Sequence, residues 1–405
     1  MRWTVMVMWQ GLFSQNRLIL TGLGALLASA AALSIAGIYL GSVREVLSLI
    51  PGLMVLLPST INMRGSIAGV FASRLSSSMH LGEFSIDFRD GSVLGDNIRA
   101  SLVVTVETAF ALGILAYAAG LLFGFPTVGV VDLVLISVVS GIVSGLVVTG
   151  VTLVVALVSY RYGLDLDMIA APTVTTSGDI VTLPILMLSA TSVMLLSPGA
   201  RQALGVVVVA VVIATLLYTR RRSEGTGAIV RENLALLIPL GVFGTLAGLT
   251  YSFNLDNLLV LAVFLILIPP FTGGLGSIGG ILASRLSTEM HTGEVNPSFL
   301  PGRGVVHHFI ISYLYTLILL PLLALIAHGA AVLMELNSPG PGVLVTISLV
   351  AGLAVVTLVN GVAYITASLS FRYGLDPDNF GIPVITSLID LIGAATLVTV
   401  MNLLL

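Results

Sequence analysis

Residues 58–83 of the chain read PSTINMRGSIAGVFASRLSSSMHLGE, and residues 269–294 read PPFTGGLGSIGGILASRLSTEMHTGE. The two stretches align without a gap, and each matched residue lies 211 positions from its partner, as Arg74 does from Arg285. Polar residues are retained in both stretches together with the small and apolar ones. Because repeated sequence at one fixed offset indicates repeated structure, we expect two copies of one structural unit.

The composition is typical of an integral membrane protein. Of the 405 residues, 57% are hydrophobic and 9% are charged, whereas a soluble domain carries roughly 25% charged residues. Continuous apolar stretches of about 20 residues recur, and such a stretch crosses the hydrocarbon core of a bilayer as a helix. Their continuity excludes a β-barrel, whose strands alternate apolar and polar residues. We therefore expect an all-α polytopic protein embedded in a lipid bilayer.

Two further features of the composition exclude classes of site and partner. The chain has no cysteine, which excludes disulfides and metal sites built on thiolates. Residues 220–222 are its only run of adjacent arginines, and a position beside the membrane explains that run. We therefore expect no nucleic-acid partner.

Hydropathy predicts eleven membrane-spanning helices. Most arginines fall on one side of the membrane when the N-terminus is placed in the cytosol, and basic residues in short loops mark the cytosolic side. We therefore expect a multi-pass plasma-membrane protein with a cytosolic N-terminus. The predicted spans are residues 18–39, 46–70, 98–123, 128–158, 169–196, 203–218, 234–251, 258–282, 309–333, 342–369 and 380–405.

The repeat divides the chain into four segments. The offset of 211 also relates two RYGLD segments, at residues 161–165 and 372–376. Each copy has five predicted spans, and this odd number alone would place the second copy upside down in the membrane. The extra span between the copies adds one crossing, so the second copy has the same orientation as the first. We therefore expect two parallel five-helix repeats related by a pseudo-two-fold axis along the membrane normal. A pathway on that axis would need only one chain, so a homodimer is possible but not required. The segments are an N-terminal cytosolic segment at 1–17, the first repeat at 18–196, a linker helix with a basic loop at 197–228 and the second repeat at 229–405.

Each repeat carries one acid deep inside its last predicted helix. Asp179 and Asp390 lie about ten residues into these helices, hence roughly 15 Å deep at 1.5 Å per residue. An ionisable side chain at this depth marks an ion pathway or a proton relay, and a protonated or hydrogen-bonded structural aspartate is the alternative. Four and seven residues earlier, on the same helix face, stand the further pore-lining candidates Thr175, Thr386, Pro172 and Pro383.

The second span of each repeat combines a proline in mid-membrane with glycine and serine. This composition predicts a broken helix whose exposed backbone lines a cavity, and close helix packing on the small residues is the alternative. Asn62 and Arg64 are not matched in the second copy, where Gly273 and Leu275 stand. Arg64 could pair with an acid or repel cations. The pore-lining candidates in these spans are Asn62, Gly65, Ser66, Gly276 and Ser277.

Further acids lie at the expected cytosolic mouth and within one span. A ring of carboxylates at the start of the last helices would concentrate cations, whereas helix N-capping is the alternative role for aspartate. Glu107 is an intramembrane acid of the first repeat alone, because its counterpart is Ile318. It is a candidate for binding a coupling ion or for an interhelical hydrogen bond. The residues of the mouth are Asp165, Asp167, Asp376 and Asp378.

At these segments the chain resembles the MgtE superfamily, in particular its fused two-domain branch of eukaryotic solute-carrier magnesium transporters and their prokaryotic relatives. The family pattern A-S-R-[LI]-S-T, after a proline and G-x-x-G-N, is found here at residues 72–76 and 283–288. The pattern D-P-D-x-x-x-x-P-x-x-T-x-x-x-D ends at Asp390, and the first copy, with a leucine for the intervening proline, ends at Asp179. The resemblance implies that both aspartates are pore carboxylates for Mg²⁺. Serine replaces the family's asparagine, at Ser66 and Ser277.

The chemistry of these residues favours a hard divalent cation. Mg²⁺ prefers octahedral oxygen ligands and loses its water reluctantly, so two carboxylates with hydroxyl and carbonyl oxygens suit a largely hydrated ion. We predict a transporter of Mg²⁺, with Mn²⁺ or Co²⁺ as further ions, and not an enzyme. One alternative is a Na⁺- or H⁺-coupled divalent cation exchanger of the same fold, with Glu107 as its coupling residue. A more distant alternative is an intramembrane aspartyl protease, whose G-x-G-D motif is not matched, because Thr176 stands at its first glycine.

Overall fold

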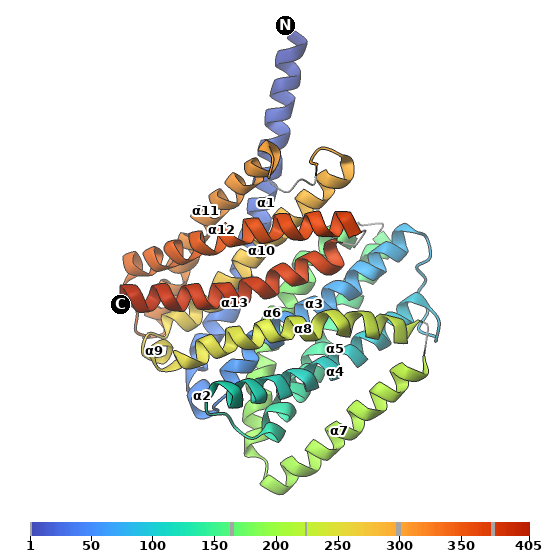
Figure 1. Cartoon of the computed structure of the whole chain (residues 1–405), viewed down its shortest axis with the longest axis vertical. Helices are drawn as coiled ribbons and strands as arrows, with labels where there is room; N and C mark the ends of the chain where they lie inside the picture. The colour runs from blue at the N-terminus through green and yellow to red at the C-terminus, as the bar shows by residue number, and fades with distance from the viewer. Residues whose placement is uncertain (1, 163–165, 223–224, 297–300, 374–376) are drawn as a thin grey trace.

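The computed structural model describes residues 2–162, 166–222, 225–296, 301–373 and 377–405, without the side chains at 2–21, 167–173, 175–176, 291 and 377–382. Within these ranges every regular element is an α-helix, and the helices lie side by side in one bundle (Figure 1). Eleven of them are long and apolar enough to cross a membrane. The helices are α1 (Arg2–Ser42), α2 (Arg44–Leu49), α3 (Leu53–His80), α4 (Val93–Phe123), α5 (Val130–Tyr162), α6 (Leu166–Leu195), α7 (Pro198–Arg221), α8 (Thr226–Phe253), α9 (Leu255–Val260), α10 (Val263–Thr292), α11 (Arg303–Leu333), α12 (Pro341–Tyr373) and α13 (Pro377–Leu404).

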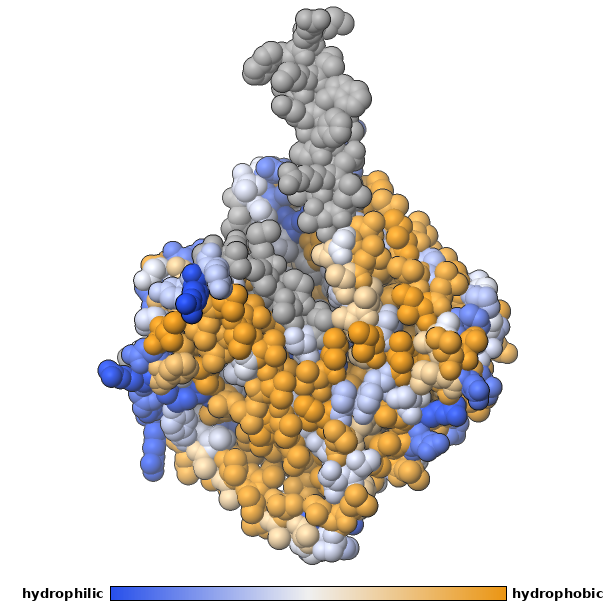
Figure 2. All heavy atoms as spheres, turned by 180° about the vertical axis from the view of Figure 1, so that it is seen from behind, coloured by the Kyte–Doolittle hydropathy of each residue, from blue (hydrophilic) through white to orange (hydrophobic). Residues whose placement is uncertain are grey.

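The surface of the bundle matches a lipid environment. Figure 2 shows apolar residues over the middle of one face, with hydrophilic residues toward its two sides. Large apolar side chains on α7 are exposed, among them Val206 and Ile213. In water such a surface would be unfavourable, but hydrocarbon accepts it, so the protein is an all-α polytopic membrane protein.

The two proline-containing spans begin later than the sequence predicts. Residues 46–70 were expected as one span, but α2 ends at Leu49 and α3 begins at Leu53. Gly52 in the intervening turn has a φ of 90°, in the left-handed region that glycine adopts readily. The span expected at 258–282 is divided in the same way, between α9 and α10.

The expected break at the prolines is wrong, because α3 continues through Pro58 from Leu53 to His80. The ring of Pro58 displaces only one backbone hydrogen bond, and its position near the start of α3 keeps that loss close to the unpaired first turn. In the second repeat, α10 continues in the same way through Pro269 and Pro270. The backbone turn therefore lies before each of these helices, at residues 50–52 before α3 and at residues 261–262 before α10.

The order and length of the helices repeat along the chain. The bounds of α5 and α12 coincide at the offset of 211, as do those of α2 and α9. Between the two sets stands α7, which lies at the outer edge of the bundle (Figure 1). Five spans precede α7 and five follow it. Because α7 adds one crossing, α8 enters the membrane from the same side as α1, and the two repeats are parallel.

The first helix of each repeat packs chiefly on the other repeat. Helix α1 lies against α10, and α8 lies against α3. A Cβ atom at Gly37 would lie 2.0 Å from the Ile266 carbonyl oxygen, and one at Gly248 would lie 2.3 Å from that of Val55. The two contacts join residues that match at the offset of 211, because Gly37 corresponds to Gly248 and Val55 to Ile266. Glycine permits such close helix approach. The two repeats are therefore interlocked, with α1 and α8 exchanged between them.

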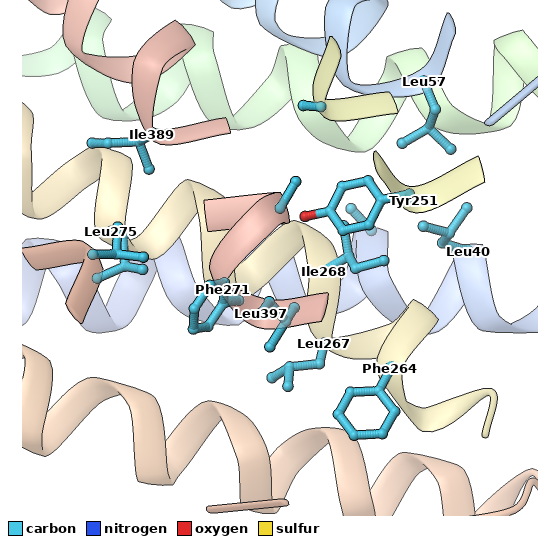
Figure 3. Close-up of a cluster of buried hydrophobic side chains, with 14 of the residues drawn as sticks. Leu40, Leu57, Tyr251, Phe264, Leu267, Ile268, Phe271, Leu275, Ile389 and Leu397 are labelled. Atoms are coloured by element: carbon cyan, nitrogen blue, oxygen red, sulfur yellow. The ribbon is translucent and has the colours of Figure 1, made fainter. Parts of the chain in front are cut away.

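The exchange places residues of both repeats in one core. Figure 3 shows Leu40 and Leu57 of the first repeat in the same cluster as Tyr251, Phe264 and Phe271 of the second. All five side chains are buried. This cluster is therefore shared between the two repeats, whereas a smaller cluster around Phe71 and Leu75 belongs to the first repeat alone.

Candidate cation site

Asp179 and Asp390 lie near the midpoints of α6 and α13, one from each repeat. Helix α6 packs on α3 and α5, and α13 packs on α10 and α12, so the two helices occupy equivalent places. Both aspartates are half-buried. They are close enough for the charge of Asp179 to act on Asp390. The two predicted acids thus occupy matching positions on matching helices and lie within range of each other's charge.

Asn62 connects the two repeats at the level of these acids. Its amide nitrogen donates to the Ser387 hydroxyl at 2.9 Å, and its carbonyl oxygen accepts from the Thr386 hydroxyl at 3.4 Å. The same side chain lies within hydrogen-bonding reach of the Asp390 carboxyl. Helix α3 of the first repeat therefore contacts α13 of the second through one polar side chain.

The hydroxyls beside Asp390 also bond to the backbone of α13 at the buried residue Pro383. Thr386 donates to the Pro383 carbonyl oxygen at 3.1 Å, and Ser387 donates to it at 2.8 Å. These bonds occupy a carbonyl within the helix and hold both hydroxyls on the face that carries Asp390. Thr386 and Pro383, two predicted pore-lining residues, are thus next to the acid.

The predicted glycines lie at the crossings that hold the acidic helices in place. A Cβ atom at Gly178 would lie 3.6 Å from the Gly65 amide nitrogen, and one at Gly276 would lie 3.6 Å from Cγ2 of Thr386. Ser66 is buried, whereas the half-buried Ser277 donates to the Gly273 carbonyl oxygen at 2.9 Å. The small residues therefore serve close helix packing, and Ser277 bonds to its own helix.

Several predicted residues lie outside the described part of the chain. Asp165 and Asp376 are not described, nor are the side chains of Asp167 and Asp378. The acidic mouth therefore stays a prediction. The same holds for the side chains of Pro172 and Thr175, so fewer contacts are described on the Asp179 half of the site.

Glu107 lies apart from the aspartates, on α4, and is 5% exposed. Neither carboxyl oxygen has a hydrogen-bond partner among the described residues. Thr215 of α7 stands beside it, so the linker helix covers this acid. Its counterpart Ile318 is 40% exposed on the surface of α11. Glu107 therefore faces the linker, and its coupling role stays a prediction.

Arg64 is buried between α3, α4 and α5. Its guanidinium donates to the Thr105 hydroxyl at 3.0 Å, and its NH1 would lie 2.7 Å from a Cβ atom at Gly145. Among the described residues it forms no ion pair with an acid. The glycine of α5 thus leaves the space that the Arg64 side chain fills.

Sequence reasoning missed Tyr251, although the offset could have singled it out, since its counterpart is Leu40. Tyr251 is 1% exposed and its hydroxyl has no hydrogen-bond partner among the described residues. Asp390 is close enough for its charge to act on this phenol. Figure 3 shows the hydroxyl turned toward α13. A second unmatched polar group therefore lies on the Asp390 side.

A second missed feature is an ionic cluster where α7 meets the first repeat, which we call the linker clamp (Asp90, Asp96, Arg99, Arg222 and Thr226). Arg222 bonds to Asp90 at 2.6 Å, and Arg99 contacts Asp96 at 3.1 Å. Thr226 donates to Asp96 at 3.0 Å. The hydrogen bond from Arg222 holds the pKa of the Asp90 carboxyl below its ordinary value. The clamp fastens both ends of the linker loop to α4 and the loop before it.

Comparison with known proteins identifies the family. The sequence model of MgtE, a divalent cation transporter, matches residues 57–189 and 268–400. The chain is 26% identical over 366 residues to solute carrier family 41 member 3 of Mus musculus, covering 85% of this chain and 74% of that protein. It is 24% identical over 398 residues to member 2 of Homo sapiens, covering 87% of this chain and 64% of that protein. No solved structure matches. Because the matched regions cover most of both repeats, including both aspartates, the chain belongs to the MgtE family of divalent cation transporters.

Proposed function

We propose that this protein transports Mg²⁺ across the plasma membrane along a pathway between its two repeats, with Asp179 and Asp390 as the pathway's carboxylates. The observation that carries the proposal is the placement of these two acids at the midpoints of α6 and α13, which pack equivalently in the two repeats, within range of each other's charge. Each acid comes from a different repeat, so one chain supplies both sides of the site. A homodimer is not needed for this function.

The ligands present suit a hydrated divalent ion. Two carboxylates balance two positive charges, and the oxygens of Asn62 and Thr386 stand beside Asp390. Because Mg²⁺ keeps several waters and prefers oxygen ligands, contacts through water fit it well. Mn²⁺ and Co²⁺ are expected to share the pathway, whereas anions should be excluded by the carboxylates.

The orientation and the entrance complete the proposal. With the N-terminus in the cytosol, most arginines lie in cytosolic loops, as basic residues in short loops usually do. The entrance would then be the start of α6 and α13, where Asp165, Asp167, Asp376 and Asp378 are expected to concentrate cations. Since the family is one of transporters, an intramembrane aspartyl protease is set aside.

Exchange coupled to Na⁺ or H⁺ is a second candidate function. The observation that favours it is Glu107, a buried carboxyl group without a described hydrogen-bond partner inside a membrane span. Intramembrane acids of this kind often carry protons or ions. However, Glu107 faces the linker helix, and no described contact joins it to the aspartates.

Flux into proteoliposomes tests both functions. The purified protein should admit Mg²⁺ down its own gradient when Na⁺ and H⁺ are equal on both sides. A flux that appears only with a Na⁺ or H⁺ gradient would establish the exchanger instead. If folded protein admits no divalent cation under either condition, the transport proposal fails.

A further inference from the structure

The two aspartates are equivalent by position but not by surroundings. On the Asp390 side stand Asn62 and Tyr251, each with a polar side chain. Their counterparts at the offset of 211 are Gly273 and Leu40, which offer no side-chain hydrogen bond. The repeat itself therefore provides a control for what each polar group adds.

Asn62 is oriented so that its carbonyl oxygen remains available. Its amide nitrogen is engaged by Ser387 at 2.9 Å. The contact from Thr386 to its carbonyl oxygen is long, at 3.4 Å, and Thr386 also donates to Pro383. A long contact of this kind is weak, so the carbonyl oxygen can accept a bond from a water molecule of a hydrated cation.

Tyr251 supplies an independent second observation. Its hydroxyl is buried at 1% exposure, turned toward α13 and without a described hydrogen-bond partner. A buried hydroxyl without a partner is unfavourable. A water molecule or a hydrated ion beside Asp390 would satisfy it, whereas the methyl groups of Leu40 need no such partner.

Packing closes the equivalent place in the second repeat. A Cβ atom at Gly273 would lie 2.8 Å from a methyl carbon of Leu33. The counterpart of Leu33 is Gly244. One copy therefore has the pair Gly273 and Leu33, and the other has Asn62 and Gly244 at the same two positions. The side chain of Leu33 thus fills the space over Gly273, and a polar side chain like that of Asn62 has no room there.

We propose that the site is asymmetric: the hydrated divalent cation is held on the Asp390 side, where Asn62 and Tyr251 bind its water, while Asp179 contributes charge from the opposite side. This inference rests on the proposed transport function. It makes Asn62 of the first repeat and Asp390 of the second repeat joint partners of one hydrated ion.

The same chemical change in the two copies tests the asymmetry. Binding of Mn²⁺ to the purified protein, followed by electron paramagnetic resonance, should weaken far more for Asp390→Asn than for Asp179→Asn. Asn62→Ala should weaken binding about tenfold, as expected for the loss of a hydrogen bond to a charged group. Tyr251→Phe, which removes only the hydroxyl, should weaken it by a smaller factor.

A double-mutant cycle separates a ligand from a packing residue. Asn62→Ala should weaken Mn²⁺ binding by its full factor in the Asp179→Asn background. In the Asp390→Asn background it should weaken binding little further, because Asp390→Asn already removes the ion contact that Asn62 shares. Thermal unfolding and size-exclusion chromatography check that each variant is folded. If Asn62→Ala does not fold, the Tyr251→Phe cycle with the same two backgrounds decides the question.

The outcomes also separate this inference from the proposed function. If the parent protein neither binds Mn²⁺ nor transports Mg²⁺, the proposed function fails, and the asymmetry fails with it. If the parent binds and transports but Asp179→Asn and Asp390→Asn weaken binding equally, only the asymmetry is overturned. Equal effects of Asn62→Ala in both backgrounds would overturn it as well.

Discussion

The two repeats share their helix packing and differ in their intramembrane polar residues. Gly37 and Gly248 meet equivalent carbonyl groups of α10 and α3, so the close crossings are the same in both copies. By contrast, Asn62, Arg64 and Glu107 belong to the first repeat, and their counterparts are Gly273, Leu275 and Ile318. The helix crossings require small residues in both copies, whereas only part of the pathway requires a particular polar group.

The linker helix explains part of this difference, because α7 packs on α4, α5 and α8 but makes no comparable contact with α11. Arg201 at the start of α7 pairs with Asp132 of α5 at 3.1 Å, and the counterpart of Asp132 is the exposed residue Val343. A polar residue facing α7 is shielded from lipid, but one facing outward from α11 would meet hydrocarbon. The first repeat can therefore hold Glu107 where the second holds Ile318.

The largest loss of stability is expected at a helix crossing that both repeats share. Gly248→Val would place Cβ 2.3 Å from the Val55 carbonyl oxygen, a backbone contact that no side-chain rotation relieves. We expect destabilisation of more than about 3 kcal/mol and little folded protein. Gly361→Ala is the control, because a Cβ there meets nothing within 4 Å. Size-exclusion chromatography and thermal unfolding measure both. A Gly248→Val variant as stable as Gly361→Ala would disprove the interlocked packing.

The next largest change in stability is expected at Glu107, a residue that differs between the two repeats. Glu107→Ile installs the residue of the second repeat and removes a buried carboxyl group whose oxygens have no described partner. We expect stabilisation by about 1–2 kcal/mol, because an unsatisfied buried polar group is unfavourable. Thermal unfolding in detergent checks this. A lower Tm would instead indicate that Glu107 holds α7 to α4 by an interhelical hydrogen bond.

A smaller effect on transport is expected at the hydroxyl beside Asp390. Thr386→Val keeps the shape of the side chain but removes its bonds to Asn62 and Pro383. We expect Mg²⁺ flux to fall about fivefold, as for the loss of one neutral hydrogen bond. Thr175→Val is the matched variant of the first repeat and should have a smaller effect. The reverse order would place the more important hydroxyl on the Asp179 side.

The smallest effect is expected in the linker clamp, which has no equivalent in the second repeat. Since Arg222 lowers the pKa of Asp90 in the folded state, the pair stabilises the fold above the unfolded pKa of about 3.9 and loses this contribution as the pH falls through the folded pKa. Asp90→Asn should lower the Tm slightly at neutral pH and not in strong acid. High salt should reduce the difference. A difference that is unchanged in acid would exclude the ion pair as its cause.

Sequence alone could predict the spans and the two acids, because both signals are local. Hydropathy places each span, and the fixed offset pairs Asp179 with Asp390. Sequence alone could not predict that α1 packs on α10 of the second repeat, since an offset shows which helices are alike and not which ones touch. Pro51 and Gly52 did mark the turn before α3, but a six-residue helix such as α2 merges with a long apolar run.

The contacts of Asn62 and Tyr251 could not be predicted for a related reason. Asn62 bonds to Ser387 across the interface between the repeats, and no pattern in either segment specifies that register. The asymmetry was visible, because Gly273 and Leu40 stand at the equivalent positions. Its location beside Asp390 required the packed structure, in which exchanged helices bring the polar groups to one side.

Mg²⁺ flux through the Asp179→Asn and Asp390→Asn variants tests the central claim most directly. Asparagine keeps nearly the volume and hydrogen-bonding reach of aspartate but removes the charge, so a structural aspartate would tolerate the change. In proteoliposomes, each single variant should conduct Mg²⁺ much more slowly than the parent, and the double variant should not conduct it, because no charge remains to balance the ion in a low-dielectric passage. A folded double variant that transports Mg²⁺ at the parent rate would contradict the assignment of the pathway to α6 and α13.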